Sequence, residues 1–123
     1  TVTYNSANAG EFTRTADGFI EFSLIHSTDA YTGSPSGTLQ IWLPPGCDAA
    51  ADTTVTVGRV SGFASSKNPS AAKIKAGTGS GSYIQLMYRS GSADATSFLT
   101  HSDLGASSTG LNYIEISGRF RAR

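Results

Sequence analysis

The sequence is poor in features that mark several protein classes. Its 123 residues include one cysteine, Cys47, so internal disulfides are excluded, and we interpret this residue as an incidental, loosely packed thiol. Acidic and basic side chains number nine each, and a net charge of zero argues against the basic surface of most nucleic-acid-binding proteins. No apolar run is long enough to cross a bilayer as a helix. We therefore expect neither nucleic-acid binding nor membrane insertion.

Strong helix-forming residues are also scarce, whereas glycine, serine, threonine and alanine make up much of the chain, with 14 glycines in all. That mixture is typical of short β-strands joined by many turns. The length fits one domain with a hydrophobic core of its own. We expect a single β-sandwich domain over residues 1–123. Because the chain starts at Thr1 rather than at a methionine, we expect it to be a piece of a longer polypeptide or a processed product.

Apolar and polar residues alternate along several short segments, as they do in strands with one buried face. The expected buried sets are Ile20, Phe22 and Leu24; Leu39, Ile41 and Leu43; Ile84, Leu86 and Tyr88; and Ile114, Ile116 and Phe120. After Val55 and Val57, Gly58 indicates a β-bulge that resets the phase before Val60. Weaker strand candidates cover residues 2–4, 11–14, 72–75 and 96–99. The predicted fold is all-β, an antiparallel sandwich of jelly-roll type.

The same alternation places four large side chains on the outward faces of strands, namely Trp42, Tyr83, Met87 and Tyr113. Exposed aromatic and methionine side chains grouped on one sheet are typical of a subunit interface or a ligand-binding patch. We predict that Tyr83, Met87 and Tyr113 share such an interface, and we add Glu115 and Arg119 to it. For Trp42, ligand binding and incidental exposure stay open as alternatives.

Six short motifs follow one another along the chain. They are Gly10–Arg14 (GEFTR), Gly18–Phe22 (GFIEF), a strand from Gly37 that ends in Leu43-Pro44, Val55–Gly58 (VTVG) with Gly62-Phe63 after it, Tyr83–Leu86 (YIQL) and Tyr113–Phe120 (YIEISGRF). Each motif alone is common in β-sandwiches, but the ordered series resembles the C-terminal jelly-roll domains at the ends of tailed-phage tail fibres. Receptor specificity lies in loops and does not carry over with this resemblance.

The resemblance implies a homotrimeric fibre tip, the C-terminal piece of a longer fibre chain. Such a tip is carried on the virion, contacts other virion proteins and binds a glycan or a protein on the host cell surface. It is not an enzyme and holds no cofactor. Three other functions stay open: a capsid-decorating or fibre-capping module without a ligand, a carbohydrate-binding module attached to an enzyme, and, with least support, a small hydrolase.

One loop has the composition of a receptor site. The segment Ser27–Ser36 joins an aromatic side chain to short polar groups and glycine. A sugar ring can stack on Tyr31 while Asp29 and Thr32 hydrogen-bond to its hydroxyl groups. Because strand residues of a trimer are committed to the core or to subunit contacts, we predict receptor contact here. An ordinary solvated loop is the alternative.

Three patterns suggest chemistry that the rest of the sequence does not support. His101-Ser102-Asp103 are adjacent residues, whereas the members of a catalytic triad converge from separate elements. His26 and Asp29 are too few to ligate a metal ion. The glycine-rich run at residues 77–81 lacks the lysine and the helix of a phosphate-binding loop, and we interpret it as a hairpin loop. We predict no catalytic residues and no metal site.

Overall fold

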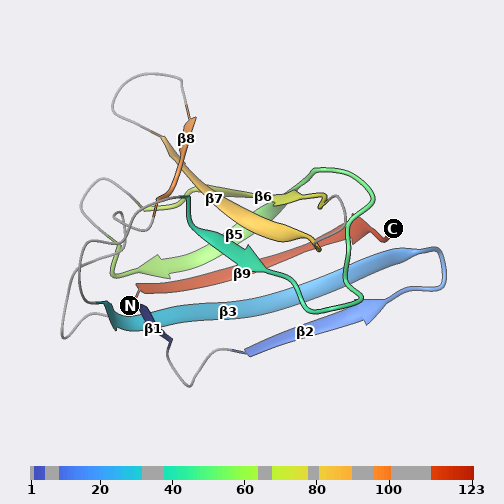
Figure 1. Cartoon of the computed structure of the whole chain (residues 1–123), viewed down its shortest axis with the longest axis horizontal. Coiled ribbons are helices and arrows are strands. Elements are labelled where there is room, and N and C mark those ends of the chain that lie inside the picture. The colour runs from blue at the N-terminus through green and yellow to red at the C-terminus, as the bar shows by residue number, and fades with distance from the viewer. Residues whose placement is uncertain are drawn as a thin grey trace.

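The computed structural model describes residues 2–4, 9–31, 38–63, 68–77, 81–89, 96–100 and 112–123, and for residues 2–4, 9, 28–31 and 96 it describes the backbone alone. Every regular element in these ranges is a β-strand (Figure 1). The strands are β1 (Val2–Tyr4), β2 (Ala9–Arg14), β3 (Phe19–Tyr31), β4 (Gln40–Trp42), β5 (Thr53–Ser61), β6 (Ala71–Lys75), β7 (Tyr83–Arg89), β8 (Thr96–Phe98) and β9 (Asn112–Arg121). The all-β prediction is confirmed, including the four weaker strand candidates.

The nine strands form one antiparallel sheet that curls around its own core. Its order is β1-β3-β9-β5-β6-β7-β4, while β2 pairs with β3 and β8 pairs with β7. The curl occurs at β5, where residues 53–55 pair with β6 and residues from Thr56 onward pair with β9. In Figure 1 the β4, β6 and β7 half therefore lies over the β3 and β9 half. We call these the β7 half and the β9 half.

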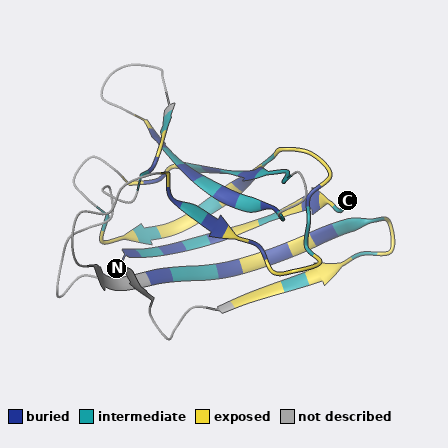
Figure 2. Ribbon diagram, viewed as in Figure 1, coloured by how far each residue is buried: buried dark blue, intermediate teal, exposed yellow. Residues whose placement is uncertain are grey.

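The core lies between the two halves and holds one cluster of buried hydrophobic side chains. All four predicted buried sets belong to it, and Ile74, Ile84, Ile114 and Phe120 are exposed by 1% or less. Buried residues alternate with more exposed ones along β3, β7 and β9 (Figure 2), as the period of a half-buried strand requires. Burial of this apolar surface is the main force that holds the two halves together.

The predicted bulge in β5 is confirmed. The register between β5 and β9 shifts between Val57 and Val60, so the residues between them have no regular partner on β9. Nearby, the two strands approach closely at Gly118, because a Cβ atom there would lie 2.8 Å from Cγ1 of Val55. The glycine in β9 thus lets the curl close over the core.

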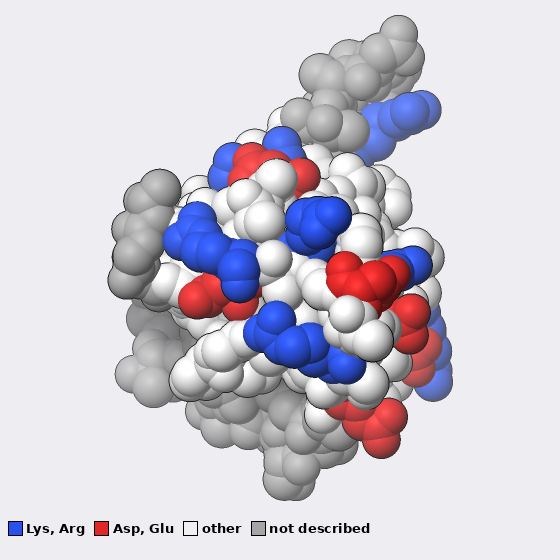
Figure 3. Space-filling model, turned by 90° about the vertical axis from the view of Figure 1, so that its right-hand side faces the viewer, with Lys and Arg blue, Asp and Glu red and all other residues white. Residues whose placement is uncertain are grey.

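Backbone and side-chain hydrogen bonds tie the segment after β4 to the β9 half. Arg14 on β2 donates from Nη2 to the carbonyl oxygen of Gly46 at 3.0 Å, and the amide of Arg123 donates to the carbonyl of Asp48 at 2.9 Å. Seen from this end, basic and acidic side chains lie side by side without a field of one sign (Figure 3). The mixed surface agrees with the zero net charge of the sequence.

Candidate functional site

The predicted receptor loop is a strand for part of its length. β3 continues to Tyr31, because β9 pairs with it through Thr28 and β1 pairs with it from Thr28 to Tyr31. Asp29 and Tyr31 are therefore strand residues, and their prediction as loop residues is wrong. Their side chains, and all of Thr32, lie outside what the structure describes. A ligand role for these three residues stays a prediction.

Trp42 is the most exposed large hydrophobic side chain among the described residues, at 53% exposure. Its neighbours Ile41 and Leu43 point into the core, so the alternation of β4 turns the indole outward. Tyr83 is its direct cross-strand partner on β7, and the two ring centroids lie 4.9 Å apart with planes at 55°. The pair fixes the indole in place and leaves much of its surface open to solvent.

A carboxylate and a glycine border the same edge of the indole. Gly81 has a φ of 94°, a conformation that favours glycine. A Cβ atom at Gly81 would lie 3.7 Å from Oδ1 of Asp48 and 3.9 Å from Cε3 and Cζ3 of Trp42. The carboxylate and the ring thus both lie close to Gly81, where the backbone conformation favours glycine. We call Trp42, Tyr83, Asp48 and Gly81 the Trp42 platform.

The nearest lysines on this face are already paired. Lys75 is the cross-strand partner of Tyr83, and its Nζ lies 2.6 Å from Oδ2 of Asp52, with Lys73 Nζ at 3.7 Å from the same atom. The hydrogen bond from Lys75 lowers the pKa of Asp52, and the same bond raises the pKa of Lys75. In contrast, no hydrogen bond or ion pair holds the Asp48 carboxylate within the described ranges.

An apolar pair lies farther along the same face. Met87 on β7 is the cross-strand partner of Phe98 on β8, which is 45% exposed. Between this pair and the Trp42 platform lie Gln85 and its partner Gln40. The outward face of the β7 half therefore carries aromatic and methionine side chains together with amide groups, as binding surfaces do.

Trp42 also borders a hollow at the seam where β4 faces β2 and β3. The hollow has a volume of about 260 Å³, and the side chains that define it are Trp42, Ile41 and Pro44 on one side and Phe12, Leu24 and His26 on the other. Burial lowers the pKa of His26, which favours its neutral form. The indole thus contacts two open regions, the outward face and the seam.

The residues of the predicted interface set do not all lie on one face. Tyr83 and Met87 belong to the β7 half, whereas Tyr113 belongs to β9, whose outward face is on the opposite side of the core. Alternation along a strand separates inward from outward residues but does not reveal on which half a strand lies. Whether any of these residues forms a subunit contact stays a prediction.

The β9 residues of that set have partners within the chain. The hydroxyl of Tyr113 donates to Oε1 of Glu115 at 2.7 Å, which raises the pKa of Tyr113, and the Arg59 guanidinium lies 5.3 Å from the Tyr113 ring centroid. Arg119 donates to Oδ2 of Asp17 at 2.7 Å and lies over the Phe19 ring. These contacts give both side chains structural roles in the monomer.

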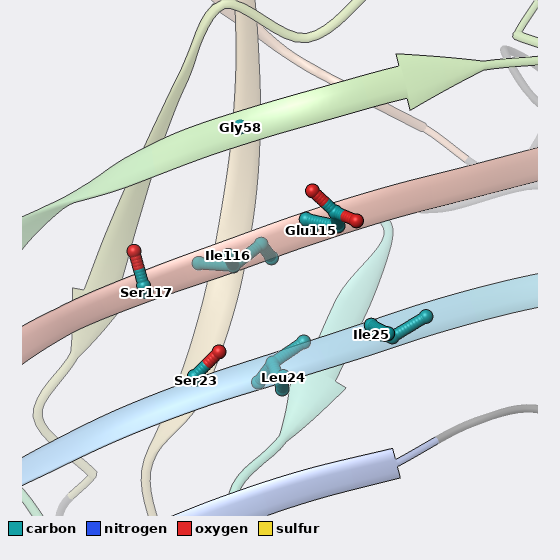
Figure 4. Close-up of a pocket in the computed structure, with 7 residues that line it drawn as sticks. All are labelled: Ser23, Leu24, Ile25, Gly58, Glu115, Ile116 and Ser117. Atoms are coloured by element: carbon teal, nitrogen blue, oxygen red, sulfur yellow. The ribbon is translucent and has the colours of Figure 1, made fainter.

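A second hollow lies on the outward face of the β9 half, with a volume of about 290 Å³. Ser23 and Ile25 of β3 border it beside Glu115 and Ser117 of β9, and Gly58 of β5 lies next to Glu115 (Figure 4). The missing side chain at the bulge leaves this space open. Its lining offers two hydroxyls and a carboxylate, but no exposed aromatic ring.

Sequence reasoning named Trp42 but missed Asp48, Gly81 and Phe98. The left-handed conformation of Gly81 and its approach to Asp48 depend on the fold, and only the glycine-rich run hinted at an unusual backbone there. Residues 78–80 and His101-Ser102-Asp103 lie outside the described residues.

The described residues contain no group of three or more His, Cys, Asp or Glu side chains that could hold a metal ion. Nor do they include a helix long and apolar enough to span a membrane. Comparison of the chain with protein-family models, with curated proteins and with solved structures finds no match.

Proposed function

We propose that this chain is the receptor-binding tip of a tailed-phage fibre, a non-catalytic homotrimeric module that attaches the virion to the host cell surface. Under this proposal the curled sheet is a jelly-roll sandwich, with the β7 half and the β9 half as its two layers. The support is the ordered series of motifs, which falls on β2, β3, β4, β5, β7 and β9. The chain would be located in the virion and would contact other virion proteins.

The observation that carries the proposal is that Trp42 packs against Tyr83 and is still exposed to solvent. A large aromatic residue that is 53% exposed lacks about half of the stabilisation that full burial would give it. The C–H face of a sugar ring can pack on such an indole, and Tyr83 holds the indole in one orientation. Gln40 and Gln85 are cross-strand partners next to the Trp42–Tyr83 pair on the same face, and they offer amide donors and acceptors. Aromatic and polar groups in this arrangement suit a cell-surface glycan.

Subunit contact is the second role that this face supports. Phe98, which is 45% exposed, and its half-buried partner Met87 form an apolar pair, which favours protein contact. A fibre-capping or capsid-decorating module would use the whole face in this way and bind no ligand. In a receptor-binding tip, the Met87–Phe98 pair supports assembly while the Trp42 platform binds the receptor. Three copies of a weak site on one tip then reinforce one another.

Adsorption to cells tests the proposal. Fluorescently labelled domain, fused to a trimeric coiled coil, is mixed with a panel of bacterial strains, and bound fluorescence is measured by flow cytometry. We expect at least one strain to bind the wild type and Trp42→Ala to lose at least about tenfold in adsorption. Phe98→Ala is the matched control, because it removes an exposed aromatic ring of the same face outside the platform.

Sedimentation of the unfused domain measures its own association. We expect wild-type trimers at micromolar concentration, weakened by Phe98→Ala and retained by Trp42→Ala. If no strain binds the wild type, the attachment function is wrong. If Trp42→Ala adsorbs as well as the wild type, the Trp42 platform is not the site of attachment.

A further inference from the structure

We infer that the Trp42 platform selects a neutral, hydroxyl-rich glycan, and that Asp48 is the side chain that recognises its hydroxyl groups. This inference rests on the proposed function and adds the chemical class of the ligand and a residue for its recognition. It is carried by the position of one carboxylate beside one aromatic ring.

The two chemical groups that a sugar ring needs both lie close to Gly81. Oδ1 of Asp48 and the six-membered ring of Trp42 lie within 3.7 Å and 3.9 Å of the same point above Gly81. A sugar presents an apolar face of C–H groups and a rim of hydroxyl groups. A ring stacked on the indole therefore brings its rim to the carboxylate, which accepts hydrogen bonds from hydroxyl groups. Such charge-assisted bonds are about twice as strong as neutral ones.

The carboxylate is available for this role. Asp48 anchors the chain through its backbone, where its carbonyl oxygen accepts the amide of Arg123, while no partner holds its side chain among the described residues. Asp52 shows the contrast, because Lys75, Lys73 and the amide of Ala76 all engage its carboxylate. Within the part of the chain that the structure describes, both side-chain oxygens of Asp48 are therefore open to a ligand.

Charge selects against acidic sugars. The lysines nearest the platform, Lys73 and Lys75, are ion-paired to Asp52, whereas no ion pair holds the Asp48 carboxylate among the described residues, so a negative charge lies near the indole. A uronic acid or sialic acid stacked on Trp42 would bring a second carboxylate close to the first. Like charges in such contact are unfavourable and give specificity against the charged ligand. A neutral glycan has no such penalty.

Gly81 keeps the recognition point open. Any other residue would put its Cβ atom in van der Waals contact with both the Asp48 carboxylate and the indole, and its φ of 94° would add backbone strain. The glycine-rich run of residues 77–81, which the sequence alone suggests is a hairpin loop, therefore supplies a residue that the site requires.

An array of bacterial surface polysaccharides tests the inference, with neutral polysaccharides and those bearing uronic acids printed side by side. The probes are the trimeric wild type, Asp48→Asn and the control Glu21→Gln, which changes an exposed carboxylate on the β9 half. We expect the wild type to bind neutral polysaccharides at least about tenfold more strongly than acidic ones, a difference of about 1.4 kcal/mol. Asp48→Asn should weaken neutral binding several-fold and reduce the preference, whereas Glu21→Gln should change neither.

The outcomes separate this inference from the proposed function. Equal or stronger binding to acidic polysaccharides, or unchanged binding by Asp48→Asn, overturns the inference and leaves attachment through Trp42 intact. Adsorption to cells without binding to any polysaccharide also overturns it and points to a protein receptor. Loss of both cell adsorption and polysaccharide binding in the wild type overturns the proposed function as well. Thermal unfolding of each variant shows that it is folded.

Discussion

Gly118 of β9 and Gly58 of β5 lie on neighbouring strands but differ in the space around them. Single substitutions can test this difference. A Cβ atom at Gly118 would lie 2.8 Å from Cγ1 and 3.0 Å from Cβ of Val55, which belong to the core. A Cβ atom at Gly58 would meet Glu115 at 3.5 Å, an ordinary contact. The first glycine is needed for packing, whereas the second is not.

We therefore predict that Gly118→Ala lowers the free energy of unfolding by about 1–3 kcal/mol, because overpacking forces β5 and β9 apart. Gly58→Ala should change it by less than about 1 kcal/mol, since no core atom has to move and the unfolded chain loses entropy. Urea unfolding of the three proteins measures both values. Equal losses at the two glycines would show that the close approach of β9 to Val55 is not real.

The lowered pKa values of two surface carboxylates affect how the stability of the fold depends on pH. The pKa of Asp17 is lowered from its ordinary value of 3.8, chiefly by the hydrogen bond from Thr15 and also by Arg119. The pKa of Asp52 is lowered by the hydrogen bond from Lys75. Since folding lowers both pKa values, these groups stabilise the fold above the ordinary carboxyl pKa, and this contribution is lost as the pH falls through the lowered values.

The double variant Asp17→Asn, Asp52→Asn should therefore lose less stability than the wild type as the pH is lowered through this range. Solvent screens both exposed pairs, so the effect should also shrink at high salt. Thermal melts at a series of pH values measure it. If the melting temperatures of the wild type and the double variant fall equally as the pH is lowered, the assigned ion pairs are contradicted.

At the scale of the strand, β9 offers the sharpest contrast between adjacent residues. Ile114 is 1% exposed in the core, whereas Glu115 points to the outward face and bonds to Tyr113. Ile114→Ala should lower the free energy of unfolding by about 2–5 kcal/mol, and Glu115→Ala should lower it far less. Chemical unfolding measures both, and equal losses would show that the inward and outward faces of β9 are assigned wrongly.

Alternation allowed the buried face of each main strand, and the bulge at Gly58, to be predicted from the sequence. It failed at the end of β3, where the polar residues His26 and Ser27 interrupt the apolar pattern, yet Ser27 is 1% exposed. The strand continues there because β1 and β9 supply hydrogen-bonding partners. Such partners come from distant parts of the chain, and local pattern does not reveal them.

The candidate site could be predicted only in part for the same reason. The alternation of β4 gives the outward direction of Trp42, but its neighbours come from β7 and from the segment after β4. The convergence of Asp48, Gly81 and Tyr83 on the indole depends on strand order and register. The separation of Tyr113 from Tyr83 likewise depends on which half each strand joins.

At the scale of the whole molecule, the curl of the sheet gives the two outward faces different chemistry. The β7 half presents the exposed rings of Trp42 and Phe98 together with Lys73 and Lys75, whereas the β9 half presents Tyr113 with serine, glutamate and arginine side chains beside a hollow at Gly58. Under the proposed function, the face of the β7 half has two roles, with the Trp42 platform for the receptor and the Met87–Phe98 pair for neighbouring chains. The central claim is that Trp42 makes the receptor contact.

The fluorescence of Trp42 tests that claim most directly, because it is the single tryptophan of the chain. In the free domain, we expect emission typical of a solvent-exposed indole and strong quenching by acrylamide. Surface polysaccharide from a strain that adsorbs the domain should, at saturation, shift the emission and protect the indole from quenching. Saturated binding that leaves both the emission and the quenching of Trp42 unchanged would contradict the account.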